Sequence, residues 1–179
     1  MGLLEDIFKW VEEHPYETAG IAAGIGVVAG ILLANSGRKT YDIKAGTKNG
    51  GSYVVNSLLP SINQVNQEIL LCDPYISLGT LVLFGVFKGK IKKVKIITKK
   101  IKCKLLFLTQ KALYEQFSGI QFEIKESDKV HDRFMLYGGT RCVMIGSSLD
   151  NLGTRDTTVV EDPNQYATKV KLFDERWTE

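Results

Sequence analysis

From residue 52 to the C-terminus, short apolar runs alternate with segments whose apolar residues recur at a helical spacing. A continuous apolar run that stops at turn residues is typical of a buried strand, whereas apolar residues three and four positions apart are typical of one helix face. The predicted strands are 53–55, 68–72, 94–98, 120–124, 133–137, 142–145 and 157–160, and the predicted helices are 58–67, 78–87, 109–117 and 164–177. This alternation predicts an α/β fold, a sheet flanked by helices on both faces.

Two of the predicted helices carry further detail. Thr109 is a residue type that caps helix N-termini, and Ser118-Gly119 is a typical helix end. In the last helix, Tyr166, Val170, Phe173 and Trp177 fall on one face, which we expect to pack against the sheet.

The N-terminal region has a different pattern. Residues 19–34 contain no charged side chain. As a helix they rise roughly 24 Å, which approaches the hydrocarbon thickness of about 30 Å. With the polar residues on either side, this run predicts a transmembrane helix at 16–36. A buried helix of the soluble domain is the alternative, and the absence of polar side chains disfavours it.

The flanks of this segment predict its orientation. Acidic residues dominate before it and basic residues follow it, so the positive-inside rule places the C-terminal part in the cytoplasm of a single-pass membrane protein. Gly20 and Gly24, like Gly26 and Gly30, are four apart, a spacing that lets two membrane helices approach closely. We therefore expect a homo-oligomer, although glycine is also simply frequent in membrane helices.

Four segments follow from these patterns. Residues 1–15 have apolar residues at helical spacing among acidic ones, which predicts a short amphipathic helix. Residues 16–36 are the predicted membrane span. Residues 37–51 are rich in glycine, lysine, asparagine and threonine and predict a linker, and residues 52–179 form the folded domain.

Composition excludes some classes of protein. The chain has 179 residues, 44% of them hydrophobic, and a net charge of +3, which excludes wholesale disorder. Cys72, Cys103 and Cys142 lie in or beside apolar runs and lack metal-ligand spacing, so we expect buried, reduced thiols. Only His14 and His131 supply imidazoles, and we expect no metal and no cofactor.

Nine lysines crowd residues 88–104. We expect a basic surface from five of them: Lys92, Lys93, Lys95, Lys99 and Lys100. A solvated sheet edge is one interpretation. The other is binding to the phosphates of nucleic acid or of anionic lipid, and the lack of interleaved aromatic residues disfavours base stacking.

The candidate chemistry lies around His131 and Arg133. On a strand, residues two apart project from the same face, so an imidazole and a guanidinium would point into one pocket and suit a phosphate. The next strand runs into a small-residue turn whose hydroxyls and amides would complete an anion cradle. The expected catalytic residues are His131, Arg133 and Ser147, and the expected phosphate-binding residues are Gly146, Ser148 and Asp150.

Three neighbouring residues have other interpretations. His131 is alternatively a structural histidine paired with Asp132 or a backbone carbonyl. Asp132 itself should point to the opposite face of the strand. Asp73, at the end of a predicted strand before Pro74, is a weaker pocket candidate.

These motifs resemble the phospholipase D superfamily over roughly residues 52–178. His131 matches the nucleophilic histidine of the family, Arg133 stands where the family has lysine, and Gly146 and Ser147 match its Gly-Ser turn. Two positions depart from the pattern, because Gly138 falls at or near the expected acid and Leu149 stands where the family has asparagine. The resemblance implies the same α/β fold, with a mixed sheet.

Together with the predicted membrane span, the resemblance implies a membrane-anchored domain that binds phosphodiesters of nucleic acid or phospholipid. Whether it also hydrolyses them, through a phosphohistidine on His131, is left open by the sequence. The family pairs two motif copies, and this chain has one, so activity implies two chains. The alternative is a catalytically degenerate module that binds anionic lipid or a protein partner, which Gly138 and Leu149 favour. A third interpretation is a structural membrane protein that oligomerises through its N-terminal helices.

Overall fold

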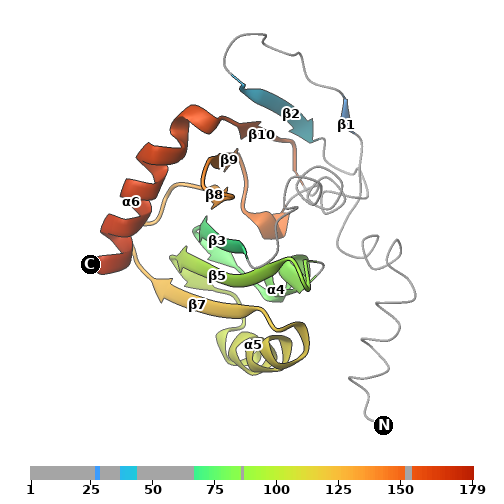
Figure 1. The fold of residues 1–179 in the computed structure, drawn as a ribbon. Coiled ribbons are helices and arrows are strands. Elements are labelled where there is room, and N and C mark those ends of the chain that lie inside the picture. The colour runs from blue at the N-terminus through green and yellow to red at the C-terminus, as the bar shows by residue number, and fades with distance from the viewer. Residues whose placement is uncertain (1–26, 29–36, 44–66, 86, 152–154) are drawn as a thin grey trace.

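The computed structural model describes residues 27–28, 37–43, 67–85, 87–151 and 155–179 (Figure 1). The predicted amphipathic helix at 1–15, the strand at 53–55 and nearly all of the helix at 58–67 lie outside these residues. Gln67, the last residue of that predicted helix, is instead the first residue of a strand.

The centre of the fold is an eight-stranded sheet with the order β1-β2-β10-β9-β8-β3-β5-β7. Its strands are β1 Val27–Val28, β2 Lys39–Ile43, β3 Gln67–Cys72, β5 Ile91–Thr98, β7 Gln121–Glu126, β8 Phe134–Tyr137, β9 Arg141–Ile145 and β10 Thr157–Glu161. The strands β3, β5 and β7 are parallel, and the other neighbouring pairs are antiparallel. The sheet is therefore mixed, as the resemblance implied. A second, two-stranded sheet joins β4 Tyr75–Ile76 to β6 Lys100–Ile101.

Helices cover both faces of the large sheet, which confirms the predicted α/β architecture. They are α4 Leu78–Gly85, α5 Lys104–Ser118 and α6 Tyr166–Thr178, with 3-10 turns η3 Leu149–Asn151 and η4 Pro163–Gln165. In Figure 1, α6 lies on one side of the sheet, α4 lies on the other, and α5 lies beside β7.

Each face has its own apolar core because side chains alternate along the strands. On the α4 side, Ile69, Leu71 and Ile96 of the sheet pack with Phe84 and Phe107 of the helices. On the other side, Phe173 of α6 is buried on Cys72, Ile97 and Phe134, and Tyr166, Val170 and Trp177 pack around it. The predicted apolar face of the last helix is confirmed.

The start of α5 differs from its prediction. The helix begins at Lys104, and Thr109 is not its cap, because the Thr109 hydroxyl donates to the carbonyl of Leu105 at 3.1 Å. Cys103 precedes the helix with a φ of 49° and is exposed, so the prediction of a buried thiol is wrong for this cysteine. The predicted end is confirmed, since Gly119 has a φ of 73° and donates to Glu115.

The N-terminal predictions are only partly covered by the described residues. Val27 and Val28, inside the predicted transmembrane helix, form strand β1 and pair with Ile43 and Asp42, so a helix is wrong at these two residues. The rest of 16–36 lies outside the described residues. The predicted linker contains β2, which pairs with β10. No helix within the described ranges is long and apolar enough to cross a bilayer.

Candidate functional site

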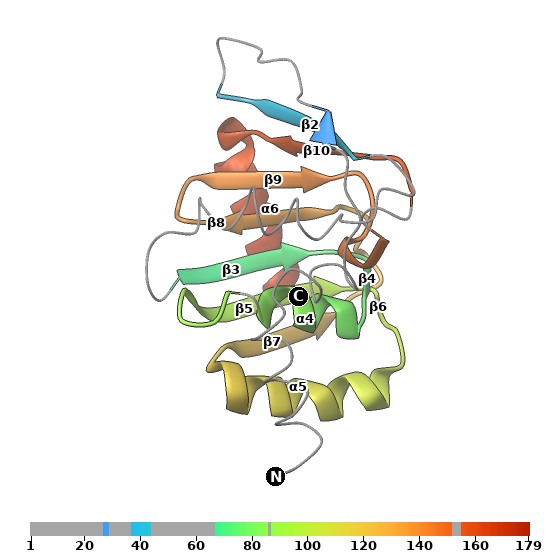
Figure 2. The ribbon, with the colours of Figure 1, turned by 90° about the vertical axis from the view of Figure 1, so that its right-hand side faces the viewer.

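The candidate site lies where three chain segments reach the same edge of the sheet. Antiparallel pairing places Cys72, the last residue of β3, opposite Phe134, the first residue of β8. Phe134 in turn pairs with Met144 near the end of β9, and the Ile145 amide donates to the carbonyl of Arg133 at 2.9 Å. Figure 2 shows β3 and β9 pointing to the same side. The Arg133 segment and the Gly-Ser turn are therefore adjacent.

The expected pairing of His131 and Arg133 on one strand is wrong, because β8 begins only at Phe134. Both residues belong to the preceding loop, where His131 is exposed and Arg133 is half-buried. Within the described part of the chain, His131 has no hydrogen-bond or ion-pair partner. The alternative of a histidine held by Asp132 is therefore not what the structure shows.

Asp132 points toward α6 and is held there by two cations. Its carboxylate lies 2.8 Å from Nη2 of Arg176 and 3.3 Å from Nζ of Lys169. Burial alone raises the pKa of Asp132, but the hydrogen bonds and charges of Arg176 and Lys169 outweigh it, and the net result is a lowered pKa. Asp132 fastens the loop to α6 on the face away from Arg133.

Arg133 is oriented by the turn after β9. Its Nε donates to Oγ of Ser148 at 3.3 Å, and Ser148 is buried. The described residues place no carboxylate in an ion pair with Arg133 and no hydrogen-bond partner on its Nη atoms. The guanidinium is therefore held at one nitrogen and leaves two nitrogens that can donate to a ligand.

Asp73 is the fully buried centre of this edge. Its carboxylate accepts hydrogen bonds from the amides of Leu149 at 2.8 Å and Tyr75 at 3.0 Å. Burial raises the pKa of Asp73. The two amides, a hydrogen bond from Ser148 and the charge of Arg133 lower it, but burial outweighs them and the net result is a raised pKa. The only sequence signal for this role was an apolar run that ended in Asp-Pro, because the partner Leu149 is remote along the chain.

The other predicted phosphate ligands are less available than expected. The Gly146 amide donates to the carbonyl of Thr158 at 2.9 Å and belongs to the sheet, so this amide is already occupied, and phosphate binding by Gly146 stays a prediction. The Ser147 hydroxyl is buried and has no hydrogen-bond partner among the described residues, Arg133 included. Asp150 lies in η3, and its side chain lies outside the described part of the structure.

The predicted basic surface divides into two parts. Lys93 pairs with Glu123 at 2.7 Å, and Lys95 pairs with Glu68 at 2.8 Å. Three others, Lys92, Lys99 and Lys100, are exposed and have no ion pair among the described residues. Lys99 and Lys100 follow β5 at the same edge as Asp73, since their amides donate to the carbonyl of Pro74.

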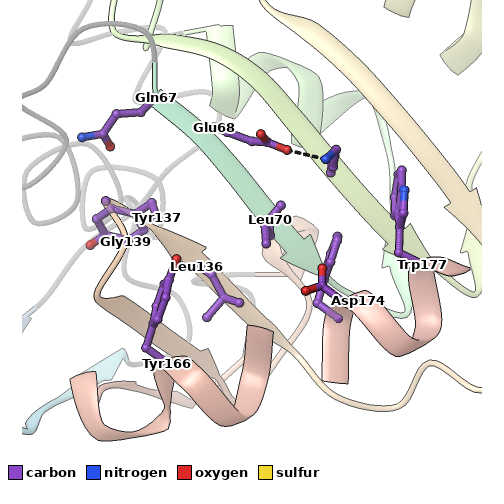
Figure 3. Close-up of a pocket in the computed structure, with 12 residues that line it drawn as sticks. Gln67, Glu68, Leu70, Leu136, Tyr137, Gly139, Tyr166, Asp174 and Trp177 are labelled. Carbon is purple, nitrogen blue, oxygen red and sulfur yellow. Dashed lines mark ion pairs between the residues drawn. The ribbon is translucent and has the colours of Figure 1, made fainter. Parts of the chain in front are cut away.

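A cavity of about 490 Å³ lies elsewhere, under α6 at the other end of β3 (Figure 3). Its walls include Glu68, Tyr166, Asp174 and Trp177, and the Glu68–Lys95 ion pair forms part of the wall on the sheet side. Carboxylates on both sides make it a poor site for a phosphate. We therefore place the candidate site at the Arg133 edge. In the described ranges, no three side chains of metal-binding type converge.

Comparison with solved structures identifies the fold. A phospholipase D family member, Nuc from Salmonella typhimurium, matches with a TM-score of 0.54 and 13% identity over 80% of this chain and 95% of that chain. TrmBL2, an archaeal chromatin protein, matches with a TM-score of 0.47 and 16% identity over 98% of this chain and 62% of that one, so this chain spans less than two thirds of it. Phosphatidylserine synthase from Haemophilus influenzae matches with a TM-score of 0.46 and 12% identity over 79% and 38% of the two chains. The match to Nuc shows that the domain has a phospholipase D-like fold.

Comparison of the sequence adds one local match. Residues 9–38 match the family model described as the DUF883 C-terminal glycine zipper region. This match includes the glycines that are four apart and covers a small part of the chain. No curated protein matches the sequence.

Proposed function

We propose that this phospholipase D-like domain binds phosphodiesters at the edge where β3, β8 and β9 meet, with Arg133 as the principal anion-binding side chain. The observation that carries the proposal is the orientation of Arg133. Ser148 holds its Nε at 3.3 Å, and the described residues supply no partner for its Nη atoms. A guanidinium that is fixed at one nitrogen suits bidentate contact with two phosphate oxygens.

The environment of Arg133 supports the same function. The buried carboxylate of Asp73 accepts hydrogen bonds mainly from neutral donors, so it positions the turn without forming a close ion pair that would neutralise Arg133. Lys99 and Lys100, at the same edge, add positive charge. Phospholipids and nucleic acids share the phosphodiester, and the test below separates them.

Binding of the full-length chain in neutral detergent to a short-chain phosphatidylglycerol and to a single-stranded oligonucleotide tests the proposal. We expect Arg133→Gln to lose at least about tenfold in affinity, because a hydrogen bond to a charged group is lost. Arg133→Lys keeps the charge but loses the bidentate geometry, so its affinity should fall between those of Arg133→Gln and the wild type. Lys171→Gln, which removes an exposed charge on α6, is the matched control and should bind like the wild type. Equal binding by Arg133→Gln would contradict the proposal.

Hydrolysis is a second candidate function, and the exposure of His131 favours it. The imidazole Nε2 would attack phosphorus while the bond to the leaving oxygen breaks and a second imidazole donates a proton to that oxygen. Water would then attack the phosphohistidine and return a proton to the second imidazole. One chain supplies one such imidazole, so the second must come from His131 of another copy.

Cleavage of a chromogenic phosphodiester tests this second candidate. We expect a rate that rises with the square of protein concentration below the dimer dissociation constant and that vanishes in His131→Ala, while phosphatidylglycerol binding is retained. A wild type that binds but shows no cleavage at concentrations where it is dimeric is a binding module.

We further propose that residues 16–36 anchor the chain in a membrane, with the domain in the cytoplasm, in a state in which Val27 and Val28 leave their pairing with β2. The glycine zipper match at 9–38 would then reflect association of these segments as helices. Protease added outside intact cells should leave the domain uncut. Digestion of the domain under those conditions would reject this orientation.

A further inference from the structure

The first turn of α5 exposes three leucines to solvent. Leu105, Leu106 and Leu108 are 83%, 49% and 45% exposed, whereas Phe107 between them is fully buried. Helical geometry explains the arrangement, because the leucines fan over the outer half of the turn and Phe107 points inward. An apolar cluster of this kind at the surface of a soluble domain is typical of a contact with a partner or with lipid.

Two exposed lysines lie on the N-terminal side of this cluster. Lys99 and Lys100 lie just before α5, are exposed, and form no ion pair among the described residues. Lys100 lies opposite Tyr75 in the pairing of β6 with β4, and Tyr75 is itself 39% exposed. Exposed apolar side chains flanked by two unpaired lysines match the chemistry of an anionic bilayer, whose phosphates lie just outside its acyl region.

We propose that Leu105, Leu106 and Leu108, with Lys99 and Lys100, dock this domain on the surface of an anionic lipid bilayer. The leucines would enter the boundary between headgroups and acyl chains, and the lysines would contact lipid phosphates. The leucines favour a bilayer over nucleic acid as the ligand. The phosphates of nucleic acid would attract only the lysines, whereas a bilayer also offers an apolar region for the leucines.

This docking surface also has a consequence for the candidate site. Lys99 and Lys100 donate their amides to Pro74, the residue after Asp73, so the docking surface and the Arg133 edge lie at the same end of the sheet (Figure 2). A docked domain would present Arg133 to the headgroup layer. The docking itself does not depend on the proposed function and would stand if Arg133 bound no ligand.

A natural cysteine beside this surface can carry a fluorescent label that reports contact with lipid. Cys103 is exposed immediately before α5, whereas Cys72 and Cys142 are buried and burial raises the pKa of each to about 11. A polarity-sensitive fluorophore should therefore react selectively with Cys103 in the full-length chain. The matched control carries Cys103→Ser and Thr140→Cys, which moves the label to the exposed turn at the opposite edge.

On phosphatidylcholine vesicles that contain phosphatidylglycerol, the emission of the Cys103 label should shift to the blue, and the Thr140→Cys label should stay water-like. A chain anchored through residues 16–36 would hold both labels near the vesicle. A blue shift of the Cys103 label alone therefore reports docking of the surface at α5. Replacing Lys99 or Lys100 with Gln should lower the ratio of docked to undocked domain, read from the size of the shift, about fivefold each. Leu105→Gln with Leu108→Gln should abolish the shift.

Three results would overturn the proposal. The first is an unshifted Cys103 label on vesicles with which the protein co-floats. The second is an equal shift on pure phosphatidylcholine, which would exclude a role for the lysines. The third is a label that is already shielded from water without vesicles, because the leucines would then be covered by another segment of this chain or by a second copy.

Discussion

The two ends of the β8–β9 hairpin have opposite characters. At one end, Gly138 and Gly139 have φ values of 62° and 72° and form an exposed turn. At the other end, β9 runs through Gly146 into the buried Ser148 and Leu149, which contact Arg133 and Asp73. The exposed turn reverses the chain beside the cavity under α6, whereas the buried turn joins three strands and orients a guanidinium.

The comparison also explains a departure from the phospholipase D motif. Gly138, at or near the position expected for the acidic residue, has a positive φ that side-chain-bearing residues rarely adopt. An acid at this position would be strained, and it would lie at the end of the hairpin away from Arg133. The carboxylate at the Arg133 edge is instead Asp73, from a different strand.

The largest expected effect is that of Asp73→Ala at the buried end. Removing the carboxylate leaves the amides of Leu149 and Tyr75 without their acceptor, and we expect a loss of about 3 kcal/mol in the free energy of unfolding. Denaturant titration measures it, with Thr140→Ala in the exposed turn as a control that should change little. A change below about 1 kcal/mol for Asp73→Ala would mean that the network is not structural.

Gly146→Ala should cost about 2 kcal/mol because a Cβ there would overpack the junction with β10. The added atom would lie 2.8 Å from Oγ1 of Thr157 and 3.1 Å from the carbonyl oxygen of Thr158, and the carbonyl belongs to backbone that cannot rotate away. Thermal unfolding measures the cost. A neutral effect would show that β10 is free to move outward.

Gly139→Ala at the exposed end should cost less, about 1 kcal/mol, and for a different reason. A Cβ would meet no atom within 4 Å, so the cost is only that of a φ of 72° in a residue with a side chain. Gly139→Asn tolerates this conformation better and should recover part of the loss in the same unfolding assay. If Gly139→Ala proved more costly than Gly146→Ala, the contrast between the two ends would be reversed.

The smallest expected effects are two opposite pH dependences. Burial raises the folded-state pKa of Asp73, so the stability it contributes falls as pH rises from the unfolded value of about 3.9 through the folded pKa. The pKa of Asp132 is lowered, so the stability from its pairing with Arg176 and Lys169 is lost as pH falls through the folded pKa. We would measure the free energy of unfolding of the wild type, Asp73→Asn and Asp132→Asn across acidic pH. The difference between each variant and the wild type should change with pH in opposite directions for the two variants. Slopes of the same sign would contradict this assignment.

The sequence predicted those elements whose signal is local. Apolar runs located β3, β5, β8, β9 and β10, and helical spacing located the buried face of α6. The start of α5 was missed because Leu105 and its neighbours face solvent, which inverts the usual pattern. The centre of the site was underestimated because Asp73 is defined by its bond to Leu149, a contact that only the tertiary fold creates.

The central claim is that the Arg133 edge binds a phosphodiester. Titration of the ¹⁵N-labelled full-length chain in neutral detergent with diethyl phosphate tests it most directly, read from the Arg133 Nε–H signal and the backbone amides. We expect the Nε–H signal of Arg133 and the amides of 147–149 to shift together with one saturable affinity, while the amides of 138–140 stay unchanged. Shifts that centre on the cavity under α6, or an Arg133 signal that does not move at saturation, would contradict the account.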